Sequence, residues 1–462
     1  MSSQAAEIRN GSSWRGHGAA YNFPPGLERN LVWFAFRKFK PQNPIELFQF
    51  LVRRYGNIAH YRIGPANIVF VNEPEYIYEV FVAQQDKFIK ERTQQRSKMV
   101  LGEGMITAEG AEHRRQRAAA LPAFHKQRIA GYAATMVERA AAYREQWRHG
   151  ETIDVSQEMM RLTLDVVART LFSADLGRDV GRATEALNEI MRLYHALVAL
   201  PGIEALVNLP VPGLRRFRPA KKRLDEVVGR LIDERRATPE GHDDLLAMML
   251  ESQVPFDREA LRDQVLTIFL AGYETVANGL TWTFYLLSQN PDAEAKLHAE
   301  VDSVLGGRLP APEDVARLSY TEMVLAESMR LYPPAWAMGR VATQDFALGP
   351  YHLPRKTTIL ASQYILHRDA RFFAEPLAFR PERFAPEGKA AIPRFAYLPF
   401  GLGLRRCIGE GFAWMESILV LATVAQRWKL RMDPAQVVEP QPLITLRTRY
   451  GMKMKVERRP GE

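Results

Sequence analysis

The residues whose types and spacing could do chemistry surround the single cysteine of the chain. They read Phe400-Gly401-Leu402-Gly403-Leu404-Arg405-Arg406-Cys407-Ile408-Gly409. Glycine reaches positive φ without a steric penalty, so Gly401 and Gly403 permit a tight loop. The largely apolar stretch 411–428 predicts a helix that starts just after Cys407. At a helix N-terminus the dipole and the free backbone N–H groups favour a thiolate, which is a metal ligand.

A single thiolate suits a haem iron, because the porphyrin supplies the other donors. The alternative is that Cys407 is a buried small hydrophobe, the usual fate of a free cysteine. The spacing Phe-Gly-x-Gly-x-Arg-x-Cys-x-Gly argues against this alternative. Six fixed positions match a random start with a probability of roughly 10⁻⁸ at ordinary residue usage. On this pattern the loop resembles the ligand loop of the cytochrome P-450 family, the haem-thiolate monooxygenases.

The composition bounds the organisation of the chain. Its 462 residues contain 47% apolar and 25% charged residues, with no linker, repeat or low-complexity run. We expect a single domain over residues 1–462, mainly α with a smaller β-rich region, in which residues 1–22 form a flexible N-terminus. One cysteine excludes an intramolecular disulfide.

No stretch approaches the roughly 20 apolar residues of a membrane span, and the N-terminus lacks the apolar core of a signal peptide. The apolar segment 31–36 and the basic segment 37–40 are too short to span a bilayer. They could touch a membrane surface or pack on the protein body. We expect a cytoplasmic protein.

The formal net charge of +9 leaves an acidic protein partner open. The basic residues are scattered and no nucleic-acid-binding motif is present, which argues against nucleic acid. The chain also lacks His-Glu-x-x-His, so zinc-dependent hydrolysis is excluded.

His113 and Arg117 lie four residues apart in a basic segment, so they share one side of a predicted helix. Taken alone, such a segment is usually a solvated helix face. Paired cations also suit the two propionates of a haem. In the resembled family, a Trp or His followed four residues later by Arg has this task, and this chain carries the His version.

A very long helix is predicted from the N-cap Asp257 to a point before Pro291, because no proline interrupts the run. Near its middle stands Ala271-Gly272-Tyr273-Glu274-Thr275. By itself this could be an incidental glycine and a solvent-facing glutamate. It also fits the oxygen-handling motif of the resembled family, in which the acid and the hydroxyl relay protons. Glu274 and Thr275 match those two positions, and Val276 stands where a second hydroxyl is frequent.

Glu327 and Arg330 are three apart on another predicted helix, a weak signal alone. In the resembled family this pair joins the Arg of a later Pro-Glu-Arg-Phe segment, which is Arg383 here, in a buried structural triad. Other patterns predict a hairpin over residues 57–71, a short helix at 74–82, short strands at 346–349 and 357–360, and a hairpin within 443–456.

The resemblance implies haem b between the long helix and the cysteine loop, with Cys407 as the axial ligand. It implies O₂ as co-substrate and insertion of one oxygen atom into a C–H bond of a lipophilic molecule. Thiolate donation favours O–O cleavage. The residues that it assigns to the cofactor and the oxygen pocket are His113, Arg117, Ala271, Gly272, Arg340, Phe400, Gly401, Arg405 and Gly409.

No flavin or nicotinamide motif is present, so electrons should come from NAD(P)H through a separate ferredoxin or flavodoxin with its reductase. Arg406 is expected to face this acidic partner, together with Arg114, Arg115 and Lys126. Two alternatives remain: a peroxide-dependent or lipid-rearranging enzyme of the same fold, and a non-catalytic haem gas sensor.

The substrate pocket is assigned by analogy alone. A fatty acid, terpenoid or steroid would suit the apolar character of the candidate positions, which could equally be ordinary core. They are Met105, Ile106, Phe269, Trp336, Ala337, Met338 and Leu446.

Overall fold

The computed structural model describes residues 13–16, 19–27, 43–175, 185–186, 189–190, 214–238, 243–252 and 256–459. The chain divides into two compact units. The first comprises Met1–Arg92, Ala335–Leu377 and Ala390–Cys407, and the second comprises Thr93–Pro334, Ala378–Lys389 and Ile408–Glu462. Each unit has its own hydrophobic core. The apolar and basic segment 31–40 lies outside the described residues.

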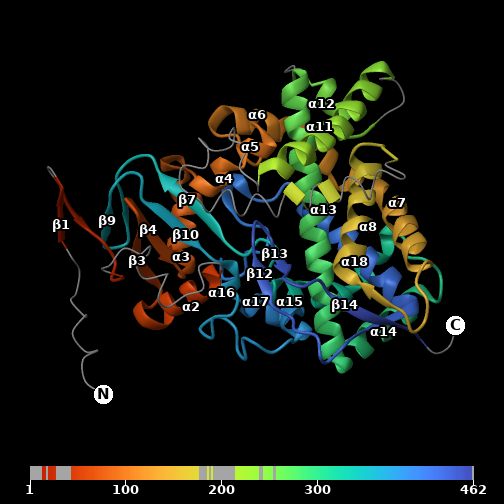
Figure 1. Ribbon diagram of the computed structural model, residues 1–462. Coiled ribbons are helices and arrows are strands. Elements are labelled where there is room, and N and C mark those ends of the chain that lie inside the picture. The colour runs from red at the N-terminus through yellow and green to blue at the C-terminus, as the bar shows by residue number, and fades with distance from the viewer. Residues whose placement is uncertain are drawn as a thin grey trace. The chain divides into compact units, whose positions relative to one another are not determined.

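The first unit contains the two larger sheets (Figure 1). One has the strand order β3-β4-β10-β7-β5 and consists of β3 (Ile58–Ile63), β4 (Ala66–Val71), β5 (Phe88–Lys90), β7 (Met338–Ala342) and β10 (Thr358–Ala361). The other has the order β1-β2-β9-β8 and consists of β1 (Ser13–Gly16), β2 (Ala19–Asn22), β8 (Phe346–Leu348) and β9 (Tyr351–Leu353).

The predicted first hairpin is confirmed. Strands β3 and β4 pair antiparallel, with Ile58 opposite Val71 and Ile63 opposite Ala66. Gly64 turns between them at a φ of 57°. Strand β10 then joins β4 in parallel, a pairing of residues almost 300 positions apart that local patterns do not predict. Val69, Val71 and Ile359 fill the core beneath this sheet.

Short helices complete the first unit. They are α2 (Pro44–Tyr55), α3 (Pro74–Tyr78), a π-helical turn η1 (Glu79–Ala83), η2 (Gln85–Lys87), α16 (Gln363–Leu366) and η6 (Gly403–Arg405). The predicted helix at 74–82 is therefore α3 continued by η1. The Pro74 ring sits in the first turn, where no backbone N–H is needed.

The second unit is mainly α-helical, as predicted. Its helices are α5 (Lys98–Leu101), α6 (Gly110–Ala120), η3 (Leu121–Phe124), α7 (Lys126–Arg144), α8 (Val155–Leu171), α11 (Leu214–Ala237), α12 (Leu245–Leu250), α13 (Arg258–Gln289), α14 (Pro291–Leu305), η4 (Pro312–Arg317), α15 (Ser319–Leu331), η5 (Pro381–Phe384) and α18 (Glu410–Arg427). Two more helices, α4 (Arg92–Arg96) and α17 (Pro386–Ala391), cross the boundaries between the units.

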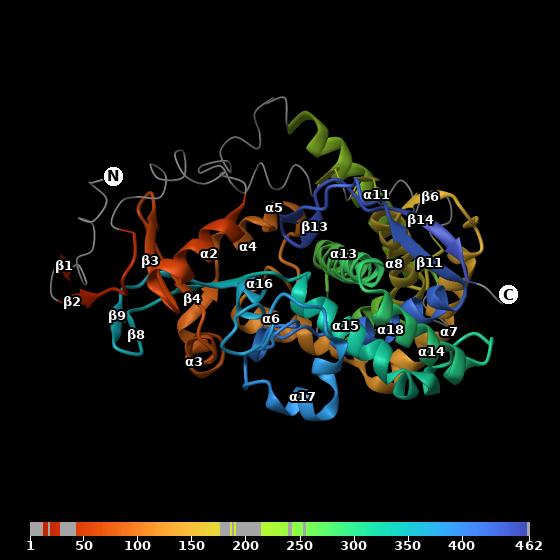
Figure 2. The same ribbon diagram turned by 90° about the horizontal axis from the view of Figure 1, so that it is seen from below.

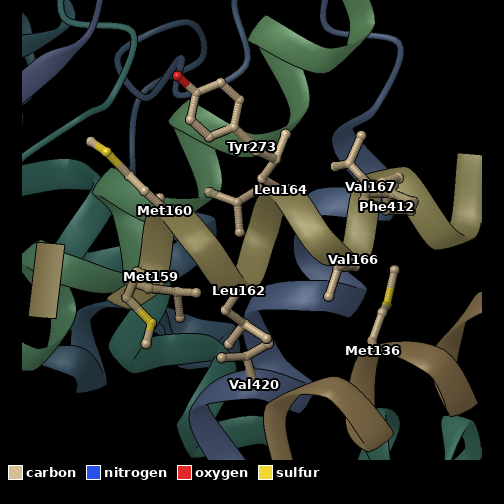
Figure 3. Close-up of a cluster of buried hydrophobic side chains, with 14 of the residues drawn as sticks. Met136, Met159, Met160, Leu162, Leu164, Val166, Val167, Tyr273, Phe412 and Val420 are labelled. Atoms are coloured by element: carbon tan, nitrogen blue, oxygen red, sulfur yellow. The ribbon is translucent and has the colours of Figure 1, made fainter. Parts of the chain in front are cut away.

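Helix α13 is the long helix that the sequence predicts. Asp257 caps it by accepting a hydrogen bond from the Ala260 N–H at 2.7 Å. It packs against α8, α15 and α18. Figure 2 looks along α13 and shows α8 on one side of it and α15 and α18 below it. Tyr273 of α13 joins side chains of α8, such as Leu164 and Val166, in one buried cluster (Figure 3).

The strands of the second unit correct one prediction. Residues 443–456 do not form a hairpin of their own. Strand β13 (Leu446–Thr448) pairs with β12 (Pro440–Pro442) before it, whereas β14 (Lys453–Arg458) pairs with β11 (Trp428–Met432) and β6 (Thr152–Asp154). Alternation locates strands in a sequence but does not select their partners.

Candidate active site

The cysteine loop has the geometry that its glycines predict. Gly401 and Gly403 both have a φ of 69°. The Cys407 N–H donates to the Phe400 carbonyl at 3.0 Å, which closes the loop on itself. Cys407 is exposed, so the buried-hydrophobe alternative is wrong. Helix α18 begins at Glu410 with Gly409 as its N-cap, three residues after the sulfur.

Residues from η1 and η2 brace this loop within the first unit. The Leu404 N–H donates to the Gln85 side-chain carbonyl at 3.1 Å. At Gly403, an added Cβ would lie 2.2 Å from the Phe81 carbonyl oxygen, so no other residue fits there. Neither Phe81 nor Gln85 was predicted from the sequence. A glycine pattern predicts a tight loop, but it does not indicate which other segment of the chain packs against that loop.

Helix α13 has one place where its buried surface is interrupted. From residue 263 to residue 284, only Ala271, Gly272 and Thr275 are not buried. Ala271 and Gly272 precede Thr275 by four and three residues, so both are neighbours of Thr275 on one face of the helix. An accessible patch in the middle of a core helix is where a second molecule can approach its backbone. The patch coincides with three of the five residues of the predicted oxygen-handling motif.

Two of these residues also have local structural roles. The Thr275 hydroxyl donates to the Ala271 carbonyl at 2.7 Å, four residues earlier on the helix. At Gly272, an added Cβ would lie 3.0 Å from Val167 of α8, so glycine allows the two helices to approach closely. The alternative of an incidental glycine is therefore wrong.

Glu274 does not reach solvent; its side chain is 1% exposed. Its Oε1 atom accepts hydrogen bonds from the Thr445 hydroxyl and, at 2.8 Å, from Arg447 Nε. Burial alone lowers the pKa of Arg447, but the neighbouring Glu274 carboxylate outweighs this and holds that pKa above its ordinary value. Sequence analysis missed Thr445 and Arg447, which lie far from Glu274 along the chain.

The cations predicted for the propionates are distributed over both units. In the second unit His113 is buried on α6 and Arg117, on the same helix, is half-buried. In the first unit the Arg340 guanidinium lies 4.8 Å from the Phe81 ring centre, and Arg405 is less exposed than its neighbour Arg406. The roles predicted for Arg405 at the haem and for Arg406 at the electron donor stay predictions.

One predicted docking cation has other partners. Arg115 donates to both carboxylate oxygens of Glu112, and its guanidinium lies 4.4 Å from the Phe256 ring centre. Arg114 and Lys126 are exposed. Exposed cations attract an acidic partner more strongly than an ion-paired one. The docking role of these cations stays a prediction.

The structural triad is assembled within the second unit. Arg330 Nε lies 2.7 Å from Glu327 Oε2, and Arg383 Nε lies 3.4 Å from Glu327 Oε1. Arg330 and Glu327 are both fully buried. Arg330 also donates to the Ala378 carbonyl at 3.0 Å, so the triad ties α15 to the segment that ends in η5. Removing one partner from such a pair typically costs about 3–5 kcal/mol.

The predicted pocket residues differ in their surroundings. Phe269 is buried and stacks on Phe172 at 4.5 Å, which is a core position. Met105 is tied to α13 through its N–H, which donates to the Gln264 side chain at 3.2 Å. Leu446 is fully buried. Ile106, Trp336, Ala337 and Met338 are half-buried. Their role as pocket residues stays a prediction.

Comparisons with known proteins point to the same family as the cysteine loop and the motif on α13. The family model for cytochrome P-450 matches residues 24–455. The chain is 40% identical over 405 residues to "Cyclooctatin synthase" of Streptomyces melanosporofaciens, covering 85% of this chain and 87% of the relative. It is 36% identical to "Cyclooctat-9-en-7-ol 5-monooxygenase" of the same organism, with 82% and 84% covered. It is 32% identical to "Pentalenene oxygenase" of Streptomyces avermitilis, with 88% and 92% covered.

The chain belongs to the cytochrome P-450 family. It is a haem-thiolate monooxygenase that inserts one atom of O₂ into a C–H bond. The family uses haem b, O₂ and electrons from NAD(P)H through partner proteins. Among the described residues, no helix is long and apolar enough to cross a membrane.

The described residues fit a haem. The chain supplies one exposed thiol on a closed glycine loop, which suits an axial ligand, and basic side chains at four motif positions, which suit propionates. The accessible patch on α13 is built from a small side chain, a glycine and a hydroxyl, so it admits a small molecule at the backbone.

The two glycines of the loop give a matched test of its rigidity. Alanine at either position adds backbone strain of about 1–2 kcal/mol, because φ is positive. Gly401→Ala adds nothing more, since no atom lies within 4 Å of the new Cβ. Gly403→Ala also meets the Phe81 carbonyl and must displace it, which adds about 1–3 kcal/mol. The haem-to-protein ratio and the urea midpoint should fall clearly further for Gly403→Ala. Equal losses in the two variants would contradict the bracing by Phe81.

Proposed function

We propose that this cytochrome P-450 hydroxylates a cyclic terpenoid hydrocarbon or terpenoid alcohol. The relatives with 40%, 36% and 32% identity carry names that refer to cyclooctatin, cyclooctat-9-en-7-ol and pentalenene. Their matches extend over most of each chain, so the resemblance includes the substrate-facing parts as well as the haem motifs. This observation favours terpenoids over the fatty acids and steroids that the sequence alone left open.

The residues of the chain have separate tasks in this proposal. Bound haem supplies the chemistry of oxygen activation. Cys407 would hold the haem iron through its thiolate, and the closed loop keeps the sulfur at a fixed position. His113, Arg117, Arg340 and Arg405 bind the propionates by charge-assisted hydrogen bonds. Ala271 and Gly272 leave room beside α13. Glu274 and Thr275 hold and pass protons at the carboxylate and the hydroxyl.

The accessible patch on α13 is the observation that supports the proton relay. Thr275 is the only hydroxyl-bearing residue of that patch, and Glu274 precedes it directly. Relatives that work with peroxide and without a reductase often lose the acid and threonine pair. Because this chain keeps both residues, the monooxygenase reaction is favoured over the peroxide-dependent alternative.

A panel of labelled reactions tests the substrate class. Cyclic diterpenes and sesquiterpenes, with their monohydroxylated derivatives, should displace an iron-bound water and shift the Soret band. A fatty acid of similar carbon number and a steroid serve as comparison ligands. With electrons supplied and dioxygen labelled with the heavy isotope, the hydroxylated terpenoid should carry one labelled oxygen atom. Tighter binding and faster oxidation of the fatty acid or the steroid would contradict the terpenoid proposal.

We propose further that a ferredoxin or flavodoxin delivers the electrons and approaches exposed cations of the chain. Arg406 adjoins Cys407 in the sequence, and Arg114 adjoins His113. Lys126 starts α7 and is exposed. Such cations raise the association rate with an acidic partner, and the gain falls as salt screens it. A cytoplasmic location stays a prediction.

Charge reversal tests this steering. Arg114→Glu and Lys126→Glu should each lower the second-order rate of haem reduction by an acidic ferredoxin on the order of tenfold at low ionic strength, with a weaker salt dependence. Lys222→Glu on α11 is the control, because Lys222 is exposed and remote in sequence from every haem motif. An equal loss in the control would indicate a net-charge effect, and an unchanged rate in the two test variants would dismiss the docking role.

A further inference from the structure

Three residues of α13 attach the helix to the β12–β13 hairpin. Glu274, Asn278 and Trp282 are spaced four apart, so they form a single row along the helix. Asn278 donates to the Thr445 hydroxyl at 3.1 Å, and Trp282 Nε1 donates to the Leu446 carbonyl at 2.9 Å. All three are buried. The hairpin is therefore held against the helix by hydrogen bonds in a water-poor environment.

Thr445 connects two of these residues through its hydroxyl group. Its hydroxyl oxygen accepts from Asn278 and its hydroxyl hydrogen is donated to Glu274 Oε1. The second donor to the same oxygen is Arg447 Nε. Oε1 thus accepts two hydrogen bonds. Glu274 Oε2 is also buried, but it has no hydrogen-bond partner in the described part of the chain.

The charged and titratable groups around Glu274 come from α13 and the β12–β13 hairpin, and α8 contributes a hydroxyl group nearby. On α13 its neighbour is Tyr273, whose pKa is raised mainly by burial, so the phenol stays neutral. From the hairpin comes Arg447, which is charged. Helix α8 contributes the Thr163 hydroxyl, which donates to the Tyr273 carbonyl at 2.9 Å. Arg447 is therefore the cation that balances the Glu274 carboxylate among the residues facing it.

We propose that Arg447 and Thr445 are positioning residues that fix Glu274 through Oε1 and leave Oε2 as the atom that exchanges protons. This rests on the proton relay under the proposed function. In the proposed relay Oε2 accepts a proton and gives it up to the next member of the relay, so the carboxylate is unchanged after each transfer. A carboxylate held by one oxygen keeps its orientation through this exchange, which is the requirement for general acid–base catalysis.

The central variant is Arg447→Met, which removes the cation and keeps much of the side-chain length. Without it Oε1 keeps only the Thr445 donor, so the orientation of the carboxylate is no longer fixed. Coupling, measured as product formed per O₂ consumed, should fall on the order of tenfold, with a matching rise in peroxide release. Thr445→Val should give a smaller loss, because one donor to Oε1 remains.

Arg449→Met is the matched control. Arg449 follows the same hairpin and pairs with Glu439 at 3.2 Å instead of Glu274. Its coupling should stay within about twofold of that of the unmodified enzyme. Substrate affinity, from titration of the Soret shift, should be similar for Arg447→Met and Arg449→Met. A fall in coupling that is equal in the two variants would overturn the proposal, since it would report damage to the hairpin alone.

A stability measurement gives a readout independent of activity. Arg447→Met leaves an uncompensated buried charge, and Glu274→Gln removes that charge. The double variant should therefore have a higher urea midpoint than Arg447→Met alone and a restored haem content. Arg447→Lys should recover part of the coupling. If Arg447→Met does not fold, the double variant and Arg447→Lys still decide the question. The pairing would be overturned if the double variant lost more stability than the two single variants lose together.

Glu274→Gln separates this proposal from the one on which it rests. If Glu274→Gln and Arg447→Met both uncouple the reaction, the positioning role is supported. If Glu274→Gln uncouples and Arg447→Met does not, the relay stands and the positioning role fails. If Glu274→Gln has no effect on coupling, the proton relay itself fails, whatever Arg447 does.

Discussion

A thiolate can serve as a metal ligand only when its sulfur is accessible and its backbone is fixed, and this constraint organises the ligand loop. Cys407 is exposed, yet its N–H is bonded to the Phe400 carbonyl. The two positive-φ glycines allow this closure, and the approach of the Phe81 carbonyl leaves no space for a side chain at Gly403. Openness and rigidity are thus provided by the same short segment.

Helix α13 combines two functions on neighbouring faces. One face carries the accessible patch with Thr275, and the next carries the buried row that begins with Glu274. Because adjacent residues differ by about 100° around a helix, the acid can be anchored in the core while the hydroxyl beside it stays accessible. The anchor is the β12–β13 hairpin, from which Thr445 and Arg447 donate hydrogen bonds to Glu274.

The fold class, the long helix, the first hairpin and the positions of the chemical motifs could be predicted from the sequence, because each depends on local periodicity or on fixed spacing. The pairing partners of the strands could not be predicted. Strand β10 pairs with β4 across almost 300 residues, and β13 pairs backward with β12 where alternation had predicted a hairpin with the following strand. These pairings depend on the packing of whole units.

The same limit applies to the site. Glu274 was found from its motif, but Arg447 and Thr445 lie more than 170 residues later and belong to no motif. A polar row at 274, 278 and 282 within an apolar helix was the only available signal. For Arg115, composition predicted a docking cation, whereas the contacts with Glu112 and Phe256 engage it locally. Charge alone does not distinguish a solvated side chain from a paired one.

The central claim is that Cys407 is the axial ligand of a haem, and the spectrum of the reduced protein with carbon monoxide tests it most directly. The unmodified protein should show the red-shifted Soret band that thiolate ligation produces. Cys407→His should bind haem but lose that band together with monooxygenase activity. A red-shifted band or retained monooxygenation in Cys407→His would contradict the account.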